Sequence, residues 1–378
     1  MFGKFFSKNK KQVASQPFSF SQYQDVITET LRHYRSENFP DGVLCIATEF
    51  DVTQSEEADL VVKLTMPFPC QGELEQISHS LTVQLSCVIK FIIKLEVKAV
   101  RQISLNGAKN NVKNIIAISS GKGGVGKSTT TVNLAYALIA EGAKVGILDA
   151  DIYGPSIPRM LGLKNEKPSS SDGKLMDPVI AHGLSAISIG FLVEEKEATV
   201  WRGPMASSAF NQLIQETAWP KLDYLLIDMP PGTGDIQLTL AQKVPVSAAV
   251  IITTPQDIAL VDAKKGVSMF TKVKVPVLGV IENMSYHLCE NCGHQSHIFG
   301  EQGGINLANS HKTPLLGQLP LDITIRENAD KGVCELINDP NSNNSQRYRE
   351  AARQMVAQLF NQIKANNEPE IIKVINVE

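Results

Sequence analysis

The sequence predicts a two-part chain, in which a small α+β domain precedes a larger α/β domain built on a doubly wound, mostly parallel sheet. Three observations support this prediction. A glycine-rich loop at 121–128 separates an apolar strand pattern from an alanine-rich helical pattern. Segments of strand length then alternate with helical segments, and several are apolar throughout, as strands buried on both faces are. Residues 17–100 form a separate compositional block before the loop.

The first block has the alternation of a small α+β unit. An amphipathic helix is expected first, because Val26, Ile27 and Leu31 fall on one side at helical spacing. The predicted order is helix, strand, strand, helix and strand, at residues 20–35, 42–50, 59–66, 73–85 and 88–95.

The second block is predicted to alternate strands and helices, with right-handed crossovers between parallel strands. Its last helix, at 345–364, has one apolar face. In such a sheet the ligand lies beyond the carboxyl ends of the strands, and polar residues do follow several of them. The strands are expected at 114–119, 144–149, 223–228, 248–254, 277–283 and 315–319.

A polar stretch rich in asparagine separates the two blocks and indicates a linker. We therefore divide the chain into five parts. They are a basic tail (1–16), the small α+β domain (17–100), the linker (101–113), the α/β domain (114–365) and a C-terminal tail (366–378).

The glycine-rich loop matches the phosphate-binding pattern G-x-x-x-x-G-K-[ST]. Glycines allow backbone N–H groups to converge on an anion, and the following helix adds a favourable field. Lys127 is expected to reach the β- and γ-phosphates, and the Ser128 hydroxyl to ligate Mg²⁺. A glycine-rich turn that binds nothing is the alternative, which the strand–loop–helix context disfavours. The predicted nucleotide contacts are Gly121, Lys122, Gly123, Gly124, Val125, Gly126, Lys127, Ser128 and Thr129.

Carboxylates follow two of the predicted strands. Asp149 and Asp151 come after one strand, and Asp228 ends another. Carboxylates beside a phosphate loop require a cation, and Mg²⁺ is the expected one. Either segment alone could be an ordinary strand-end turn, but the two together beside the loop predict a magnesium site.

The chain has six cysteines, too few and too scattered for a disulfide framework. Cys289 and Cys292 have the C-x-x-C spacing with which two thiolates bind one metal centre. With His294 and His297 they could form a zinc knuckle within one chain. A loop with two buried cysteines is the remaining alternative.

Composition excludes several classes of protein. The 378 residues carry a formal net charge of −3, so no overall positive field indicates nucleic-acid binding. No apolar run approaches the roughly 20 residues that cross a bilayer. The basic N-terminus lacks the apolar stretch of a secretory signal. We therefore expect a cytoplasmic protein with no nucleic-acid partner and no stable membrane association.

The extra lysine after the first glycine makes the loop resemble that of the dimeric ATPases that include MinD, the ParA proteins and the nitrogenase iron protein. The resemblance implies that Lys122 reaches the partner subunit's nucleotide, as a cation supplied in trans. It also implies that Asp151 orients the attacking water, that Asp149 supports the metal and that Asp228 holds Mg²⁺ through water. Asn283 resembles the residue that reads adenine in this group.

Phosphate loop and cysteine pair together resemble the Mrp/ApbC family of iron–sulfur cluster carriers. The resemblance implies a slow ATP hydrolase that holds a [4Fe–4S] cluster on Cys289 and Cys292, and that has a cluster donor and recipient apoproteins as partners. Such a cluster needs four thiolates, and a symmetric homodimer would supply them. The shared motifs lie at 121–128, 149–156, 201–205, 228–235, 282–285 and 289–292.

Three other functions share some of these features. A positioning or partition ATPase would need a basic membrane-binding helix or a DNA-binding patch. A zinc-binding adaptor would use the cysteine and histidine cluster. An electron-donating reductase like the nitrogenase iron protein spreads its cluster ligands over two loops. The N-terminal block resembles the small domain that precedes the ATPase in many bacterial members, chiefly over 61–71. For Cys70 a structural role and a functional role both stay open, with the structural role at least as well supported.

Overall fold

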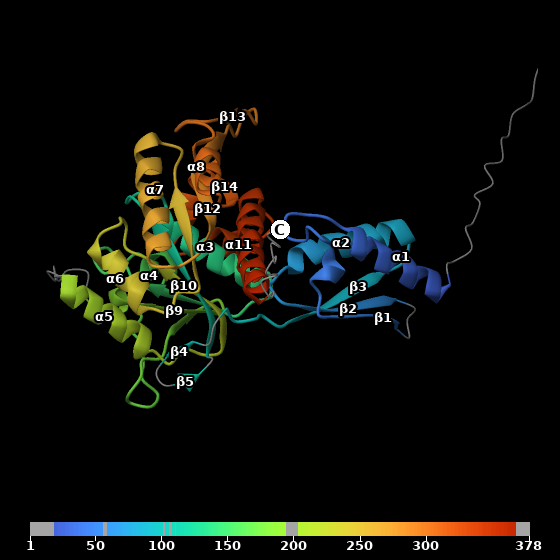
Figure 1. Cartoon of the computed structure of the whole chain (residues 1–378), viewed down its shortest axis with the longest axis horizontal. Helices are drawn as coiled ribbons and strands as arrows, with labels where there is room; N and C mark the ends of the chain where they lie inside the picture. Colours follow the sequence, from blue (N-terminus) through green and yellow to red (C-terminus); the bar gives the residue numbers. More distant parts are fainter. Residues whose placement is uncertain are drawn as a thin grey trace, which may run out of the picture.

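The computed structural model describes residues 19–55, 59–100, 103–105, 108–109, 111–193 and 203–367. The predicted tail at 1–16 lies outside these residues, as do residues 368–378 and the start of the motif at 201–205. Two units lie side by side, each built on its own sheet (Figure 1).

The N-terminal unit has a three-stranded sheet in the order β1-β2-β3, in which β1 is antiparallel and β3 parallel to β2. β3 is an edge strand of this sheet. Its helices lie along one side of the sheet (Figure 1). The elements are α1 (Phe20–His33), β1 (Glu49–Gln54), β2 (Leu60–Met66), α2 (Gln71–Leu85) and β3 (Ile89–Leu95).

The strand predicted at 42–50 is wrong over most of its length. A short 3-10 turn, Val43–Cys45, occupies this position, and the strand begins only at Glu49. Gly42 has a φ of 100°, and a Cβ there would lie 2.2 Å from the Arg32 carbonyl oxygen. The chain therefore turns against the end of α1 at this glycine, which apolar patterning does not reveal.

The second unit confirms the predicted doubly wound, mostly parallel sheet. Its strand order is β13-β12-β11-β6-β10-β7-β9-β8, and β14 also pairs with β12. β8 and β13 are antiparallel to their neighbours. The strands are β6 (Val112–Ser120), β7 (Val145–Asp149), β8 (Val179–Ala181), β9 (Leu184–Ser188), β10 (Leu222–Asp228), β11 (Ala248–Thr253), β12 (Val277–Leu288), β13 (Gln295–Ser296) and β14 (Leu315–Pro320).

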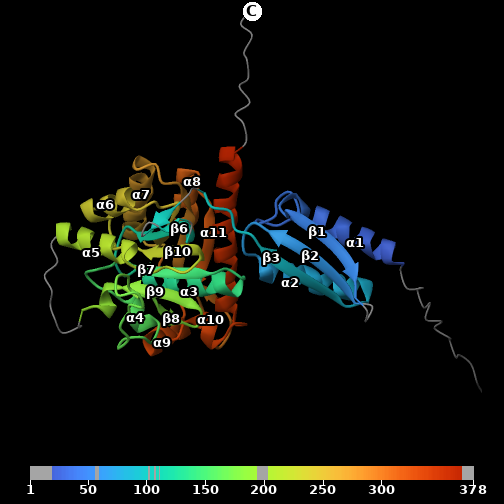
Figure 2. The ribbon, with the colours of Figure 1, turned by 90° about the horizontal axis from the view of Figure 1, so that it is seen from below.

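Helices cover both faces of this sheet, and the sheet separates two hydrophobic cores, one against α3 and α11 and the other against α5, α6 and α7 (Figure 2). A short hairpin of β4 (Ser104–Leu105) and β5 (Ala108–Lys109) precedes the sheet. The helices are α3 (Lys127–Ala140), α4 (Ile157–Met160), α5 (Gly203–Gln215), α6 (Asp235–Lys243), α7 (Asp257–Lys272), α8 (Gly303–His311), α9 (Ile323–Lys331), α10 (Glu335–Asn338) and α11 (Asn343–Asn367).

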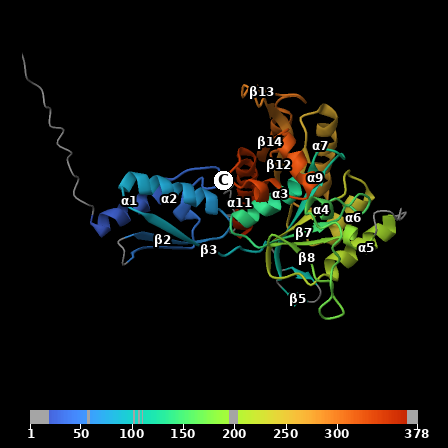
Figure 3. The ribbon, with the colours of Figure 1, turned by 180° about the vertical axis from the view of Figure 1, so that it is seen from behind.

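The N-terminal unit packs against α11, which lies between the two sheets (Figures 2 and 3). One hydrophobic core runs through this contact and includes residues of both units. Phe68 and Phe360 meet across it, with ring centroids 5.7 Å apart. Among the described residues, no helix combines the length and the apolar character needed to cross a bilayer.

Candidate functional site

The glycine-rich loop joins β6 to α3 at the carboxyl edge of the central sheet. Gly124 and Gly126 both have a φ of 82°, a conformation that few side chains adopt. A Cβ at Gly126 would also lie 2.2 Å from Nδ2 of the Asn283 side chain. All the predicted loop residues except Gly121 and Val125 line a cavity of about 190 Å³, together with Asp151 and Pro231. The loop therefore already encloses a small space.

Lys127 is buried among carboxylates. Its Nζ lies 2.8 Å from Asp228 Oδ2 and 3.9 Å from Asp151 Oδ2, and its side chain is 6% exposed. It also donates to Ser128 Oγ over 3.2 Å. The ammonium group thus compensates the acidic groups that surround it.

Asp228 lies at the centre of this cluster of acidic residues and is fully buried. Its oxygens accept hydrogen bonds from Ser128 Oγ (2.5 Å) and Thr131 Oγ1 (2.8 Å). Thr131 was not predicted, although its place one turn after the loop could have indicated it. The predicted magnesium ligands Ser128 and Asp228 are therefore in direct contact.

Asp149 lies next to Asp228, because β7 and β10 are parallel and pair these two residues in register. Asp149 is fully buried and accepts hydrogen bonds from Ser188 Oγ (2.9 Å), the Asp151 amide (3.1 Å) and the Ile157 amide (3.3 Å). Burial and the charge of Asp228 raise the pKa of Asp149 to about 7. Burial also raises the pKa of Asp151, while Lys127 opposes this shift.

The chemistry of these donors fits Mg²⁺. Ser128, Asp149 and Asp228 present oxygen atoms, and the buried acidic groups carry more negative charge than Lys127 alone balances. Within the described ranges no set of three or more histidine, cysteine, aspartate or glutamate side chains is positioned as a complete metal site. Proteins bind Mg²⁺ through one or two carboxylates together with phosphates and water.

Lys122 and Asn283 approach the loop differently. Lys122 lines the cavity, but its side chain is exposed, and it does not join the Lys127 and Asp228 group. Asn283 extends from β12, and its Nδ2 donates to the Val125 carbonyl oxygen over 2.9 Å. β12 is therefore tied directly to the phosphate loop.

The cysteine pair lies in the hairpin between β12 and β13. The strand predicted at 277–283 continues to Leu288, so Cys289 follows its last residue directly. The Cys289 amide donates to the His294 carbonyl oxygen (3.0 Å), and the Gly293 amide donates to the Cys289 carbonyl oxygen (2.8 Å). Cys292 is exposed and Cys289 half-buried. Backbone N–H groups of Cys292 and Asn291 lower the pKa of the Cys289 thiol, which favours the metal-binding thiolate.

The structure does not assemble a zinc knuckle from the two cysteines and the two nearby histidines. His297 Nδ1 lies 3.0 Å from the Ser285 carbonyl oxygen, and the ring packs edge-on against Tyr286. His294 is exposed. In the part of the chain that the structure describes, this hairpin offers two metal ligands rather than four.

The remaining cysteines differ from this pair in their burial or in their position in the chain. Cys70 and Cys334 are buried, and burial raises the pKa of both thiols. Cys45 is exposed and Cys87 is half-buried, both in the N-terminal unit.

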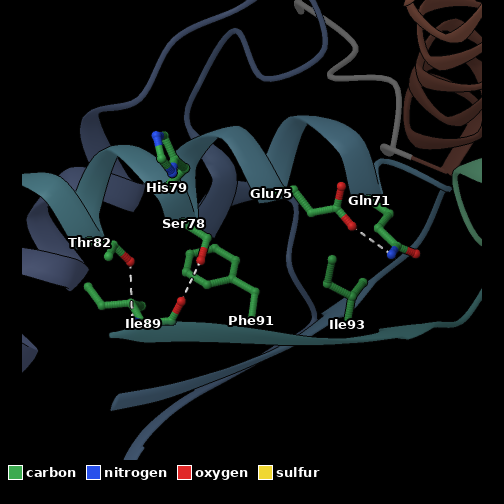
Figure 4. A pocket seen from close by; sticks show the side chains of 8 residues that line it. All are labelled: Gln71, Glu75, Ser78, His79, Thr82, Ile89, Phe91 and Ile93. Atoms are coloured by element: carbon green, nitrogen blue, oxygen red, sulfur yellow. Dashed lines mark hydrogen bonds between the residues drawn. The ribbon is translucent and has the colours of Figure 1, made fainter. Parts of the chain in front are cut away.

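A larger cavity, of about 400 Å³, lies in the N-terminal unit between α2 and β3 (Figure 4). Ser78 Oγ donates to the Ile89 carbonyl oxygen, and the Ile89 amide donates to Thr82 Oγ1. Glu75 accepts a hydrogen bond from Gln71. These contacts fasten the helix to the edge strand and leave no concentrated charge or glycine-rich backbone. Volume therefore does not identify the nucleotide site, whereas chemistry does.

Comparisons with known proteins agree with this chemistry. The family model described as ParA, NUBPL iron-transfer P-loop NTPase matches residues 111–356. The iron–sulfur cluster carrier protein of Escherichia coli K12 is 50% identical over 351 residues, which are 92% of this chain and 95% of that protein. The iron–sulfur cluster transfer protein NUBPL of Dictyostelium discoideum is 46% identical over 270 residues, 70% of this chain and 84% of that one.

Among solved structures, a nucleotide-binding protein from Archaeoglobus fulgidus in complex with ADP is 40% identical, with a TM-score of 0.53. The match covers 59% of this chain and 87% of that one. These matches confirm the resemblance inferred from the phosphate loop and the cysteine pair. The chain therefore belongs to the ParA/NUBPL family of iron-transfer P-loop NTPases.

Proposed function

We propose that this chain is an ATP-hydrolysing iron–sulfur cluster carrier, which holds a [4Fe–4S] cluster between two copies of itself and passes it to recipient apoproteins. The observation that carries the proposal is the course of β12. This strand contacts the phosphate loop through Asn283 and leads directly into the hairpin with Cys289 and Cys292. One strand thus connects the place where a nucleotide would bind with the place where a cluster would bind.

The nucleotide site provides the groups that phosphoryl transfer needs. Backbone N–H groups of the loop and the N-terminus of α3 would hold the phosphates, with Lys127 against the β- and γ-phosphates. Mg²⁺, when bound, neutralises phosphate charge, and Ser128 and Asp228 would hold it beside Asp149. Asp151 would orient the attacking water, and Lys122 of a second copy would add a cation. Hydrolysis is proposed to be slow, as in a molecular switch.

The cluster is cargo in this proposal. Each chain contributes the thiolates of Cys289 and Cys292, and a two-fold dimer contributes four, as a [4Fe–4S] cluster requires. The exposure of Cys292 supports transfer, because a recipient's thiolate can reach the cluster there and replace a cysteine of the carrier.

Anaerobic reconstitution with iron and sulfide tests the proposal on the full chain. The wild type is expected to bind about four iron atoms per dimer, with the absorption and Mössbauer spectra of a [4Fe–4S] cluster. The double variant Cys289→Ala with Cys292→Ala should bind only background iron. Cys45→Ala, at an exposed cysteine outside the hairpin, is the matched control and should keep the full iron content.

Iron content that survives the double substitution would overturn the carrier proposal. Metal analysis of the protein as isolated separates it from the zinc adaptor, which would contain zinc in place of iron. Liposome and DNA co-sedimentation with ATP separates it from a positioning ATPase. Sedimentation velocity with ATP and with the reconstituted cluster tests the dimer, and a chain that stays monomeric under both conditions contradicts the shared site.

A further inference from the structure

The helix that begins in the phosphate loop ends in contact with the N-terminal unit. Glu141 follows the last residue of α3, and its side chain is fully buried. Its carboxylate accepts hydrogen bonds from Arg349 Nε, Arg353 Nη1 and the Gly72 amide, each over 2.7 Å. Both arginines belong to α11, whereas Gly72 lies in the first turn of α2. One carboxylate thus joins the two units at the far end of the phosphate-loop helix.

The backbone of α2 approaches this carboxylate as closely as a glycine allows. A Cβ at Gly72 would lie 2.5 Å from Arg349 Nη2 and 2.8 Å from Glu141 Oε1. Both atoms are the ends of side chains, so a methyl group at this position would push the Arg349 and Glu141 side chains out of their present contact.

A second buried carboxylate extends the contact. Glu73 lies 4.0 Å from Arg353 Nε and accepts hydrogen bonds from Tyr34 Oη (3.0 Å) and Asn38 Nδ2 (2.7 Å). The side chains of Glu73 and Arg353 are 6% and 4% exposed. Charges at this depth are costly when a partner is removed, because the remaining charge cannot recruit bulk water. The two units are therefore expected to be either fully docked or separated, with little population between these states.

Movement of Glu141 would be transmitted along α3, because the helix is held at several points. Asn133 Oδ1 accepts a hydrogen bond from the Glu335 amide (3.2 Å), and Thr131 binds Asp228 in the nucleotide site. Ser128, in the first turn, binds the same aspartate. The helix that positions the phosphate-binding groups is thus the helix that the docked N-terminal unit fixes.

We propose that the N-terminal unit regulates the nucleotide site through Glu141: docking of this unit on α3 and α11 and binding of ATP strengthen each other. Glu141 is accordingly a positioning residue that acts on ATP through α3. The proposal rests on the nucleotide binding in the proposed function, but not on the cluster. Linkage requires reciprocity, so nucleotide must stabilise docking by the same factor by which docking increases nucleotide affinity.

Cys70 provides an internal reporter of docking. It precedes α2, is 1% exposed, and belongs to the same core cluster as Tyr224 of the central sheet. Burial, together with the Glu141 and Glu73 carboxylates, raises the pKa of its thiol. A thiol reagent should therefore reach Cys70 mainly when the units separate, whereas exposed Cys45 reacts in either state.

The first experiment measures labelling rates at Cys70 and Cys45 in the full chain, by peptide mass spectrometry, with and without a non-hydrolysable ATP analogue and Mg²⁺. Nucleotide is expected to slow the labelling of Cys70 about fivefold and to leave that of Cys45 unchanged. Equal Cys70 rates under conditions where calorimetry shows nucleotide binding would overturn the inference. Absence of nucleotide binding by the wild type would instead overturn the proposed function.

The second experiment separates the units by substitution. Gly72→Ala and Glu141→Gln are expected to raise the Cys70 labelling rate about tenfold and to weaken ATP binding about fivefold, with kcat at saturating ATP within about twofold of wild type. Gly266→Ala is the matched control, since a Cβ there meets only Ile251 at an ordinary 3.6 Å. If Gly72→Ala does not fold, the test depends on Glu141→Gln, because this substitution keeps the shape of the side chain. Faster Cys70 labelling with unchanged ATP affinity would show that docking does not regulate the site.

Discussion

The phosphate loop and the cysteine hairpin differ in how much of their site one chain provides. Around the loop, Lys127, Thr131 and Asp228 are buried, Ser128 is half-buried, and the four side chains already contact one another through hydrogen bonds and an ion pair. The hairpin presents two cysteines, one of them exposed, with no further metal ligand grouped beside them in the described residues. Under the proposed function, one subunit supplies all the groups around the phosphate loop except the partner's Lys122, whereas the four cluster thiolates come equally from two subunits.

Lys127→Ala should impair the phosphate-loop site and leave the cysteine hairpin intact. It is the substitution with the largest expected effect. ATP turnover should fall by about 100-fold or more, because the cation that meets the transferred phosphate is lost. Iron content after anaerobic reconstitution should stay at the wild-type level. Phosphate release and iron analysis on the same preparation measure both. Lys265→Ala, at an exposed lysine of α7, is the control. Loss of iron in the Lys127 variant would show that the two regions are not separable.

Substitution of either hairpin cysteine should impair cluster binding and leave the phosphate-loop site intact. Cys289→Ala or Cys292→Ala leaves two thiolates per dimer, so iron retention against a chelator should fall by at least about tenfold. ATP affinity, followed by calorimetry, should remain within about twofold of wild type. An equal loss of iron in Cys45→Ala would mean that the hairpin is not the cluster site.

Asp149→Asn tests how the buried carboxylates affect stability. The pKa of Asp149 is raised to about 7 in the folded chain, whereas an unfolded aspartate titrates near 3.9. The charged carboxylate therefore costs folding free energy above pH 7, and this cost decreases as the pH falls from 7 toward 4. The variant should be more stable than wild type at pH 8, by on the order of 1 kcal/mol, with a smaller gain at pH 5.

Thermal unfolding of the nucleotide-free protein at both pH values measures the effect. Asp330→Asn, at an exposed aspartate paired with Arg326, should change stability little at either pH. A gain for Asp149→Asn that is equal at pH 8 and pH 5 would contradict the raised pKa.

Asn283→Ala has the smallest expected effect and examines the link between the two regions. It removes the hydrogen bond to the Val125 carbonyl, so ATP affinity should fall by about three- to tenfold. Comparison of ATP with GTP tests whether Asn283 contacts adenine. Loss of the preference for ATP in the variant supports that contact. An equal loss of affinity for both nucleotides would mean that Asn283 only positions the phosphate loop.

Much of the nucleotide site was predictable because its residues are close in sequence to strand ends. The loop, Asp149 and Asp228 each follow an apolar strand, and parallel strands bring such residues to one edge. The side chains that hold these carboxylates in place were not predictable in the same way. Thr131 and Ser188 are common residue types, and their contacts depend on three-dimensional neighbours.

The fold was predictable where apolar runs were long, and less so where they were short or interrupted. β9 was not predicted from the sequence, because Ser185 interrupts its short apolar run and Ser188 ends it. The turn at Gly42 depends on the Arg32 carbonyl, which patterning cannot locate. The contact of Glu141 with Gly72 joins residues far apart in the chain, and each alone is an ordinary helix-end residue.

The continuous core between the two units has a practical consequence for dissecting this protein. Cleavage between them would uncover Phe68 on one piece and Phe360 on the other, and would leave Glu73 without Arg353. Newly bared aromatic surface and an unmatched charge promote self-association. The edge strand β3, which contains Phe91 and Ile93, is a further surface through which the smaller fragment could associate. Poor solubility of either fragment would therefore report the lost contact rather than an inability to fold.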